Sequence, residues 1–344
     1  MTITRRLTIL TVALGVALTT FMTPSFAGAA STSVVAFNNV GLSDPISIAA
    51  HGQYVWIGDR SGGSDDSQVV RVNAHTGAHL SITSPLIDLP WALVSDGTYV
   101  WVENGGYPGS TRGSISRIDI ATNKVSLVTR ISSQVTLAIG GPYLWVANSE
   151  AGSLLRVNRT TLAITTITSP LLFQASALCA DKHYLWVARD GGGSLYRGSL
   201  TRVSLTTGTV KGINSPYFND PVTVTSNGTF VWMPASNHVV VKVDIATSKV
   251  IKISSKSFDT SLASASTSRY AYIASVDGNT HPNGGDNGAI TQIGAKSNSL
   301  HVITSTHLTD PYAEAILGSA VWVIDTPLGL PNSRTKNLLL RVTP

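Results

Sequence analysis

The chain has 344 residues, of which 12% are charged and 43% are hydrophobic, and its formal net charge is +5. This length suffices for one large domain or two smaller ones. Low charge with many β-branched residues favours a folded, β-rich protein and excludes an intrinsically disordered one. The positive charge is too small to indicate nucleic-acid binding.

The first 30 residues have the organisation of a secretory signal peptide. Two arginines precede an apolar run over 7–21, which is short for a membrane span of roughly 20 residues. A small-x-small pattern at 25–27 predicts cleavage near Ala27 or Ala30. We therefore expect a secreted, periplasmic or cell-envelope protein whose formal charge falls to +3 when both arginines are removed. An uncleaved membrane anchor is the alternative.

A short phrase around a tryptophan recurs along the chain. It reads GQYVWIGD at 52–59, GTYVWVEN at 97–104 and GPYLWVAN at 141–148, and the later copies are KHYLWVAR, GTFVWMPA, SRYAYIAS and GSAVWVID. The copies are spaced 40–50 residues apart and are centred on Trp56, Trp101, Trp145, Trp186, Trp232, Tyr272 and Trp322. Such a period indicates a modular repeat protein.

Each repeat predicts four short strands. In the second unit, segments 91–95 and 98–103 flank an Asp-Gly hairpin signal, and segments 114–120 and 125–129 follow. Four antiparallel strands per unit of this length are typical of a β-propeller blade. We therefore predict an all-β fold, a seven-bladed β-propeller.

The two ends of the chain complement each other. The last unit stops before a fourth strand, whereas the segment SVVAFNNV at 33–40 resembles a lone fourth strand. We predict that residues 33–38 complete the seventh blade and close the ring, which removes exposed strand edges. The prediction is one domain over 31–344.

Two columns of the repeat have structural interpretations. The central tryptophan, buried on a middle strand, is expected to wedge neighbouring blades together. The third strands carry a mostly basic column: Arg71, Arg117, Arg156, Arg202, Lys242, Gln292 and Arg341. This column is either a phosphate track or a set of long stems that pack on the blades with their heads paired locally, and we favour the second.

The phrases YLWVANSEAGSLLRVN at 143–158 and ISRIDIATNKV at 115–125 resemble the YVTN/NHL-type bacterial propellers. This grouping includes the streptogramin B lyases and lies near the gluconolactonase-type propellers. The resemblance covers the mature chain and implies the propeller fold. Streptogramin lyases use a His/Glu constellation with a divalent metal on the loop face. The corresponding positions here mostly hold Ala, Ser or Thr, so the resemblance does not carry catalysis over.

The loops between second and third strands vary in length and composition, and variable loops on a rigid scaffold often bind ligands. Tyr107 with Arg112, and Tyr196 with Arg197, pair an aromatic ring with a cation in two of these loops. This combination suits a sugar, a peptide or an aromatic ligand. Packing within the loops is the alternative.

Acids precede several innermost strands: Asp44, Asp88, Asp220, Asp259 and Asp310. They are expected to ring the mouth of the central channel, either as ordinary turn residues or as a site for a cation or polar ligand. Trp91 and Tyr312 follow closely in the same strands.

Two acids interrupt otherwise apolar or small columns. Glu314 stands where the other units have Ile48, Leu93, Leu137, Leu178, Val224 and Ser264. Glu103 follows Trp101 by two residues, where other units have Gly58, Ala147, Ala188 or Ala274. A carboxylate in such a column must be paired, hydrated or shifted in pKa, and shifted acids often mark functional sites.

These features support three hypotheses. The first is a secreted, monomeric binding protein for a small molecule, peptide or polysaccharide, without nucleic-acid or membrane partners, whose candidate ligand-binding residues are Trp91, Glu103, Tyr107, Arg112, Tyr196, Arg197, Asp310 and Tyr312. The alternative is a lyase or lactonase that uses Mg²⁺ or Ca²⁺ at the channel mouth, with Glu314, His281 and His238 as catalytic candidates. The third is a purely structural adhesion or envelope module.

The enzyme hypothesis makes a direct prediction about metal binding. Excess Mg²⁺ or Ca²⁺ should raise the melting temperature, because an ion that binds only the folded state stabilises it, and EDTA should reverse the shift. Thermal melting with each ion and with EDTA measures this. An unchanged melting temperature at high metal concentration counts against a divalent site.

Overall fold

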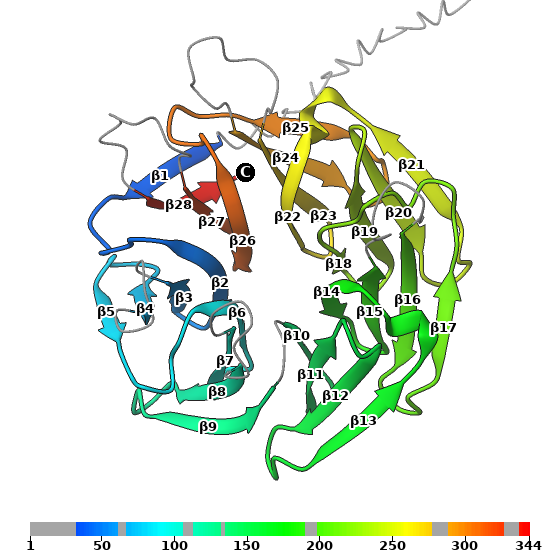
Figure 1. Ribbon diagram of the computed structural model, residues 1–344. Coiled ribbons are helices and arrows are strands. Elements are labelled where there is room, and N and C mark those ends of the chain that lie inside the picture. The colour runs from blue at the N-terminus through cyan, green and yellow to red at the C-terminus, as the bar shows by residue number, and fades with distance from the viewer. Residues whose placement is uncertain are drawn as a thin grey trace, which may run out of the picture. The chain divides into compact units, whose positions relative to one another are not determined.

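Seven four-stranded antiparallel sheets, the blades, are arranged in a ring around a common centre (Figure 1). The computed structural model describes residues 32–60, 67–105, 113–131, 135–189, 198–276, 288–326 and 337–344. The expected signal peptide lies outside these ranges, and Thr32–Pro344 forms one compact unit. The predicted seven-bladed fold is confirmed.

The blades follow chain order, and each runs from the inside of the ring outward. The innermost strands are β2 (Pro45–His51), β6 (Pro90–Ser95), β10 (Val135–Gly140), β14 (Ala175–Ala180), β18 (Thr225–Ser226), β22 (Thr260–Ser266) and β26 (Pro311–Leu317). The second strands are β3 (Tyr54–Asp59), β7 (Tyr99–Asn104), β11 (Tyr143–Asn148), β15 (Tyr184–Arg189), β19 (Phe230–Ala235), β23 (Tyr270–Val276) and β27 (Ala320–Asp325).

The outer half of each blade is equally regular. The third strands are β4 (Gln68–Asn73), β8 (Ser114–Asp119), β12 (Ser153–Asn158), β16 (Ser199–Ser204), β20 (Val239–Asp244), β24 (Gly288–Gly294) and β28 (Leu338–Thr343). The fourth strands are β5 (His79–Ile82), β9 (Val125–Arg130), β13 (Ile164–Thr168), β17 (Val210–Ile213), β21 (Val250–Ser254), β25 (Leu300–Ile303) and β1 (Ser33–Phe37). Two 3₁₀ turns, η1 (Pro170–Leu172) and η2 (Lys256–Phe258), lie in links between blades.

The first strand of the chain closes the ring. β1 pairs antiparallel with β28, with Val35 opposite Arg341, so blade 7 has the order β1-β28-β27-β26. The prediction that residues near 33–38 supply the missing fourth strand is confirmed. Pairing the first strand with the last one holds both ends of the propeller in a single sheet.

The core consists of seven hydrophobic clusters, each between two adjacent blades. Trp56 of blade 1 packs with Val100 and Val102 of blade 2, and the same relation recurs around the ring. Trp322 of blade 7 packs against Val55 and other residues of blade 1. The central aromatic residues therefore act as wedges between blades, as predicted.

The mostly basic column of the third strands is structural. Arg117 lies 4.3 Å from the ring centroid of Tyr99, and Arg71 lies 4.6 Å from that of Tyr54. The head of Arg71 also donates to the side chain of Asn123 in the next blade at 2.9 Å. These contacts support local pairing rather than a phosphate track, with cation–π contacts as a component that the sequence analysis missed.

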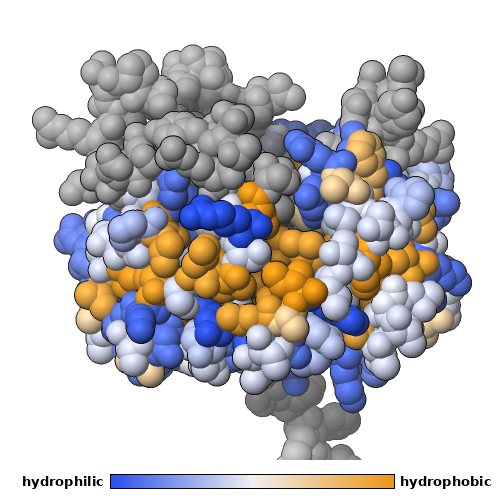
Figure 2. All heavy atoms as spheres, turned by 60° about the horizontal axis from the view of Figure 1, so that its bottom comes forward, coloured by the Kyte–Doolittle hydropathy of each residue, from blue (hydrophilic) through white to orange (hydrophobic). Residues whose placement is uncertain are grey.

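Burial decreases from the second strand to the fourth. Second strands are almost entirely buried, whereas fourth strands expose apolar residues such as Leu127 and Ile164, each 40% accessible. Figure 2 shows hydrophobic residues gathered along the side of the ring that comes forward in this view. The core thus lies between the middle strands of adjacent blades.

Blade 5 departs from the pattern at its innermost strand. β18 has only 2 residues, and the backbone at Asp220 takes a positive φ of 44° just before it. The segment is instead connected to β22 by hydroxyl pairs, with Thr223 Oγ1 2.9 Å from Ser264 Oγ and Thr225 Oγ1 2.8 Å from Ser266 Oγ. The mouth of the ring is therefore irregular at blade 5.

The wedge role predicts a large effect of removing one tryptophan. Trp145→Ala should lower the free energy of unfolding by about 3–5 kcal/mol, because it leaves a cavity between blades 3 and 4. Leu80→Ala, at an exposed rim position, should change it by about 0.5 kcal/mol or less. Urea unfolding measures both, and similar losses in the two variants would contradict the wedge role.

Candidate functional site

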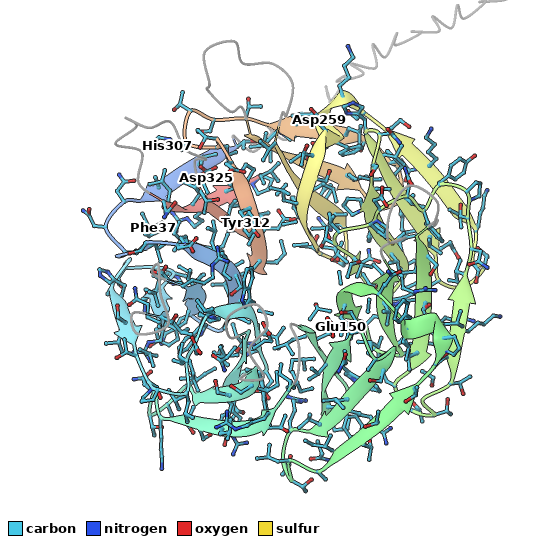
Figure 3. The ribbon with its side chains drawn as sticks, in the orientation of Figure 1. Phe37, Glu150, Asp259, His307, Tyr312 and Asp325 are labelled. Carbon is cyan, nitrogen blue, oxygen red and sulfur yellow. The ribbon has the colours of Figure 1, made fainter. Side chains whose placement is uncertain are left out.

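The second strands end, and the third strands begin, at the same end of the sheets as the links between blades, and this end is the loop face. Five innermost strands begin there with a β-bulge, and the extra residues are Ile46, Trp91, Ser176, Leu262 and Tyr312. A bulge re-aims a side chain at the rim of a sheet. Tyr312 is 39% exposed, and Figure 3 places it on the innermost strand beside the centre of the ring.

Trp91 lies under a cation at the mouth of blades 1 and 2. The guanidinium of Arg60 binds the carboxylate of Asp44 through two contacts, at 2.9 and 3.2 Å, and its centre lies 4.3 Å from the centroid of Trp91. Gly105 allows this arrangement, since a Cβ there would come 2.1 Å from the indole. The predicted ligand-binding face of Trp91 is therefore covered by a residue of the chain itself.

Three side chains at the ends of second strands hold the links between blades. Asp59 accepts from the backbone amides of Ser43 and Asp44 at 3.1 and 2.7 Å. Asp325 accepts likewise from the amides of Thr309 and Asp310 at 2.8 and 3.1 Å. Burial raises the pKa of Asp325, and these hydrogen bonds partly offset the shift.

Asn104 plays the same part in blade 2, where it accepts from the amide of Asp88 at 3.1 Å. The sequence did not predict this role for Asp59, Asn104 and Asp325. The contacts show that they position the links rather than a ligand.

The acids of the links differ in environment. The side chain of Asp44 is 43% exposed and that of Asp259 is 23% exposed, whereas Asp310 as a residue is only 1% exposed. Asp310, predicted to stand at the mouth, is buried, and its own backbone amide donates to the side chain of Asp325. The acids therefore do not form a uniform ring of exposed charge.

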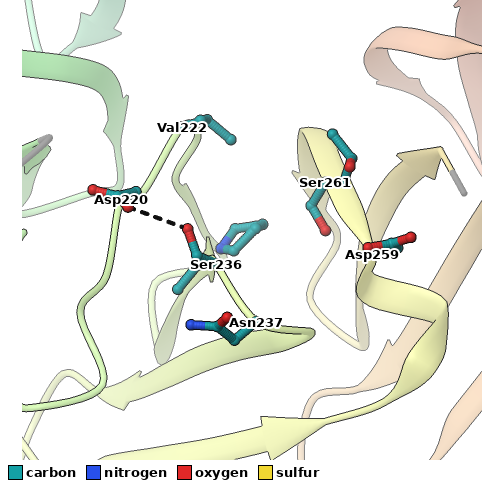
Figure 4. Close-up of a pocket in the computed structure, with 9 residues that line it drawn as sticks. Asp220, Val222, Ser236, Asn237, Asp259 and Ser261 are labelled. Atoms are coloured by element: carbon teal, nitrogen blue, oxygen red, sulfur yellow. Dashed lines mark hydrogen bonds between the residues drawn. The ribbon is translucent and has the colours of Figure 1, made fainter. Parts of the chain in front are cut away.

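A pocket of about 210 Å³ lies on the loop face where blades 5 and 6 meet, and it is lined by Asp220, Val222, Pro234, Ala235, Ser236, Asn237, Asp259, Thr260 and Ser261. Figure 4 shows Asp220 and Asp259 on opposite sides of the opening. The volume far exceeds the roughly 10–15 Å³ that one water molecule needs. Short β18 and the exposed Val222, 52% accessible, leave this space open.

His238 lies beside this pocket. Its Nδ1 is 3.7 Å from the carboxylate of Asp259, and its side chain is 47% exposed. The backbone of His238 and of Asn237 has positive φ, 59° and 67°. His238 thus belongs to the junction of blades 5 and 6.

Glu314 lies in a different seam, between blades 6 and 7. It pairs in register with Val323, which belongs to the same cluster as Tyr272. Both carboxyl oxygens are buried. Burial raises the pKa of Glu314 to about 8, and the backbone of Ala265 only partly offsets this shift. The group is therefore mostly neutral at pH 7.

This seam carries three departures from the repeat. Tyr272 replaces the wedge tryptophan, Gln292 replaces the basic residue, and Glu314 replaces an apolar or small side chain. The Gln292 amide donates to the Tyr272 hydroxyl at 3.2 Å. Burial raises the pKa of Tyr272, and nearby Glu314 adds to the shift. The three residues form one polar seam within the apolar core.

Glu103 is fully buried. It pairs in register with Ala92 and Ile115, and Ile115 packs in the cluster of Trp101 and blade 3. Glu103 therefore faces the seam between blades 2 and 3. Its position is separate from that of Glu314.

Cysteine chemistry receives no support. Burial raises the pKa of the Cys179 thiol well above its ordinary value, and nearby Asp181 adds to the shift. A raised pKa suppresses the thiolate that acts as a nucleophile. Cys179 packs at the edge of the cluster around Trp186, as expected for a small apolar residue.

Five predicted site residues lie outside the described residues: Tyr107, Arg112, Tyr196, Arg197 and His281. Across the described ranges, no group of three or more His, Cys, Asp or Glu side chains is placed to hold a metal ion. No helix within those ranges has the length and hydropathy that a membrane-spanning segment requires.

Comparisons with known proteins identify the fold. No protein-family model matches the sequence, and no curated protein matches it. The structure of the RRP9 WD40 repeats is similar, with a TM-score of 0.68 and 11% identity over 90% of this chain and 97% of that chain. The structure of U3-55K gives the same score and identity over 90% and 98%.

A chain in the crystal structure of a nidogen/laminin complex is also similar, with a TM-score of 0.55 and 10% identity over 77% of this chain and 98% of that chain. At identities this low, the likeness shows the fold alone. The chain is a seven-bladed β-propeller with WD40-like structural neighbours.

The buried carboxyl of Glu314 predicts a pH-dependent stability. Its pKa is about 8 in the folded protein, above the ordinary 4.5. The folded protein therefore holds the proton more tightly than the unfolded chain does. The free energy of unfolding is highest below about pH 4.5 and falls by about 1.4 kcal/mol per pH unit as the pH rises towards 8.

Glu314→Gln should remove this dependence, since the amide does not ionise. Urea unfolding between pH 4 and 9 measures the difference in free energy of unfolding between the wild type and Glu314→Gln. Glu150→Gln, at an exposed position, serves as control. A difference that stays constant across this range would contradict a buried, neutral Glu314.

Proposed function

We propose that the protein is an exported binding protein that holds a small ligand on its loop face, in the pocket between blades 5 and 6. The observation that carries this proposal is the pocket itself, which combines an apolar side with polar and acidic groups. Binding sites in proteins commonly have this mixture, with a few polar groups that fix the orientation of the ligand. The signal-peptide pattern at the N-terminus supports export.

The contacts favour binding over the lyase or lactonase alternative. The carboxyl of Glu314 is buried near Ala265 and Tyr272, whereas His238 pairs with Asp259 beside the pocket. These two catalytic candidates share no described contact. The resemblance to YVTN/NHL-type propellers is compatible with binding, because one propeller scaffold serves many functions.

A fragment library tests the proposal. At a ligand concentration of 100 times the Kd, a compound in the pocket should stabilise the wild-type protein by about 2.7 kcal/mol. Val222→Trp should abolish this effect, because Val222 lines the pocket and is exposed, so the larger ring fills space without disturbing the core. Thermal melting in the presence of each fragment measures the effect.

Leu80→Trp is the matched control, since it adds the same ring at an exposed position on the rim. It should leave the ligand-induced shift unchanged. If no fragment gives a shift that depends on residue 222, the proposed function is wrong.

A further inference from the structure

Blades 1 and 5 place equivalent residues at the mouth of the ring. Both have an Asp-Pro pair before the innermost strand, Asp44-Pro45 and Asp220-Pro221. Four residues after the wedge tryptophan, blade 1 has Arg60 and blade 5 has Ser236. The backbone amide of Arg60 donates to the carbonyl of Asp44 at 3.0 Å, and that of Ser236 donates to the carbonyl of Asn219, the residue before Asp220, at 2.9 Å.

The two blades differ in what occupies the space beside the aspartate. In blade 1, the guanidinium of Arg60 fills it, bound to Asp44 at 2.9 Å and lying over Trp91 of blade 2. In blade 5, Ser236 is too short to fill it, and its hydroxyl reaches Asp220 only at 3.4 Å. The pocket lies between the corresponding elements, the link of blade 5 and the start of β22 in blade 6.

The charge of the pocket suits a cationic ligand. Asp220 and Asp259 contribute two carboxylates, and no lysine or arginine is among the lining residues. Asp259 also lies 3.7 Å from Nδ1 of His238, whereas Asp220 has no cationic partner within the described ranges. Anionic ligands are disfavoured here, because a carboxylate at close range repels them.

We propose that this pocket binds a guanidinium group together with a short apolar part of the same ligand. The inference rests on the proposed function and specifies its ligand class. A planar guanidinium can match a carboxylate through two parallel hydrogen bonds, and in blade 1 Arg60 pairs with Asp44 through one hydrogen bond at 3.2 Å and a second N···O contact at 2.9 Å. Val222, Pro234 and Ala235 supply the apolar contact. The group belongs either to a small free guanidine or to an arginine side chain of a peptide.

Isothermal titration with methylguanidinium chloride and with methylurea tests the charge requirement, because the two probes share a planar shape and differ in charge. Saturable binding of methylguanidinium alone is expected. Asp220→Asn should weaken this binding by roughly 10–100-fold, since it removes a charge-assisted hydrogen bond. Equal binding of both probes, or unchanged affinity in Asp220→Asn, would overturn the inference.

A second variant reproduces the arrangement of blade 1. Ser236→Arg places the chain's own guanidinium beside Asp220 and should abolish methylguanidinium binding while the protein stays folded. Ser268→Arg is the matched control, since Ser268 is exposed at the turn between β22 and β23, and it should bind normally. Full binding by Ser236→Arg would also overturn the inference.

The source of the group is tested with an N-acetylated, C-amidated Gly-Arg-Gly peptide. At least tenfold tighter binding than methylguanidinium supports an arginine side chain, and weaker binding supports a free guanidine. The proposal of a guanidinium ligand can be wrong while the proposed binding function is right. If fragments show shifts that depend on Val222 but methylguanidinium does not bind, only the ligand class is wrong.

Discussion

Burial of one large aromatic side chain between each pair of neighbouring blades is the interaction on which the structure depends. Each wedge tryptophan packs against the middle strands of the next blade, and the last one returns to the first blade. A buried aromatic of this kind removes roughly 150–250 Å² from water, worth about 4–6 kcal/mol as an upper estimate. The repetition of this contact explains why the sequence varies little on the second strands and freely on the loops.

On the loop face, side chains at the ends of second strands hold the links between blades. Asp59, Asn104 and Asp325 fix link backbones from the ends of second strands. Where blade 5 shortens its innermost strand and has Ser236 at the position that Arg60 takes in blade 1, the same architecture leaves a pocket instead of an ion pair. The same position of the repeat thus lies at a filled site in blade 1 and at an open one in blade 5.

The polar seam between blades 6 and 7 shows that polar side chains can be buried at an interface between blades. Tyr272, Gln292 and Glu314 all depart from the repeat in this seam, and the carboxyl is buried at the expense of its ionisation. A carboxyl group that is forced to be neutral is compatible with an apolar interface, whereas a charged one is not. The substitution therefore ties the stability of one seam to pH without altering the fold.

The sequence by itself determined the number of blades, the strand pattern, the wedge tryptophans and the closure by the first strand. The repeated features return every 40–50 residues and depend on local alternation, so they can be read without knowing which blades touch. The closure follows from the fourth strand that the last unit lacks. The sequence also singled out the acids of the links, which recur before innermost strands, and Glu314, which interrupts an apolar or small column of the repeat.

Only the tertiary structure decided which of these residues meet. Asp220 and Asp259 face one pocket from different blades, Arg60 covers Trp91, and Glu314 meets Tyr272 rather than His238. These contacts join residues of adjacent blades, and their geometry depends on the course of each link. A single positive φ at Asp220 or a strand of two residues changes that course without leaving a periodic trace in the sequence.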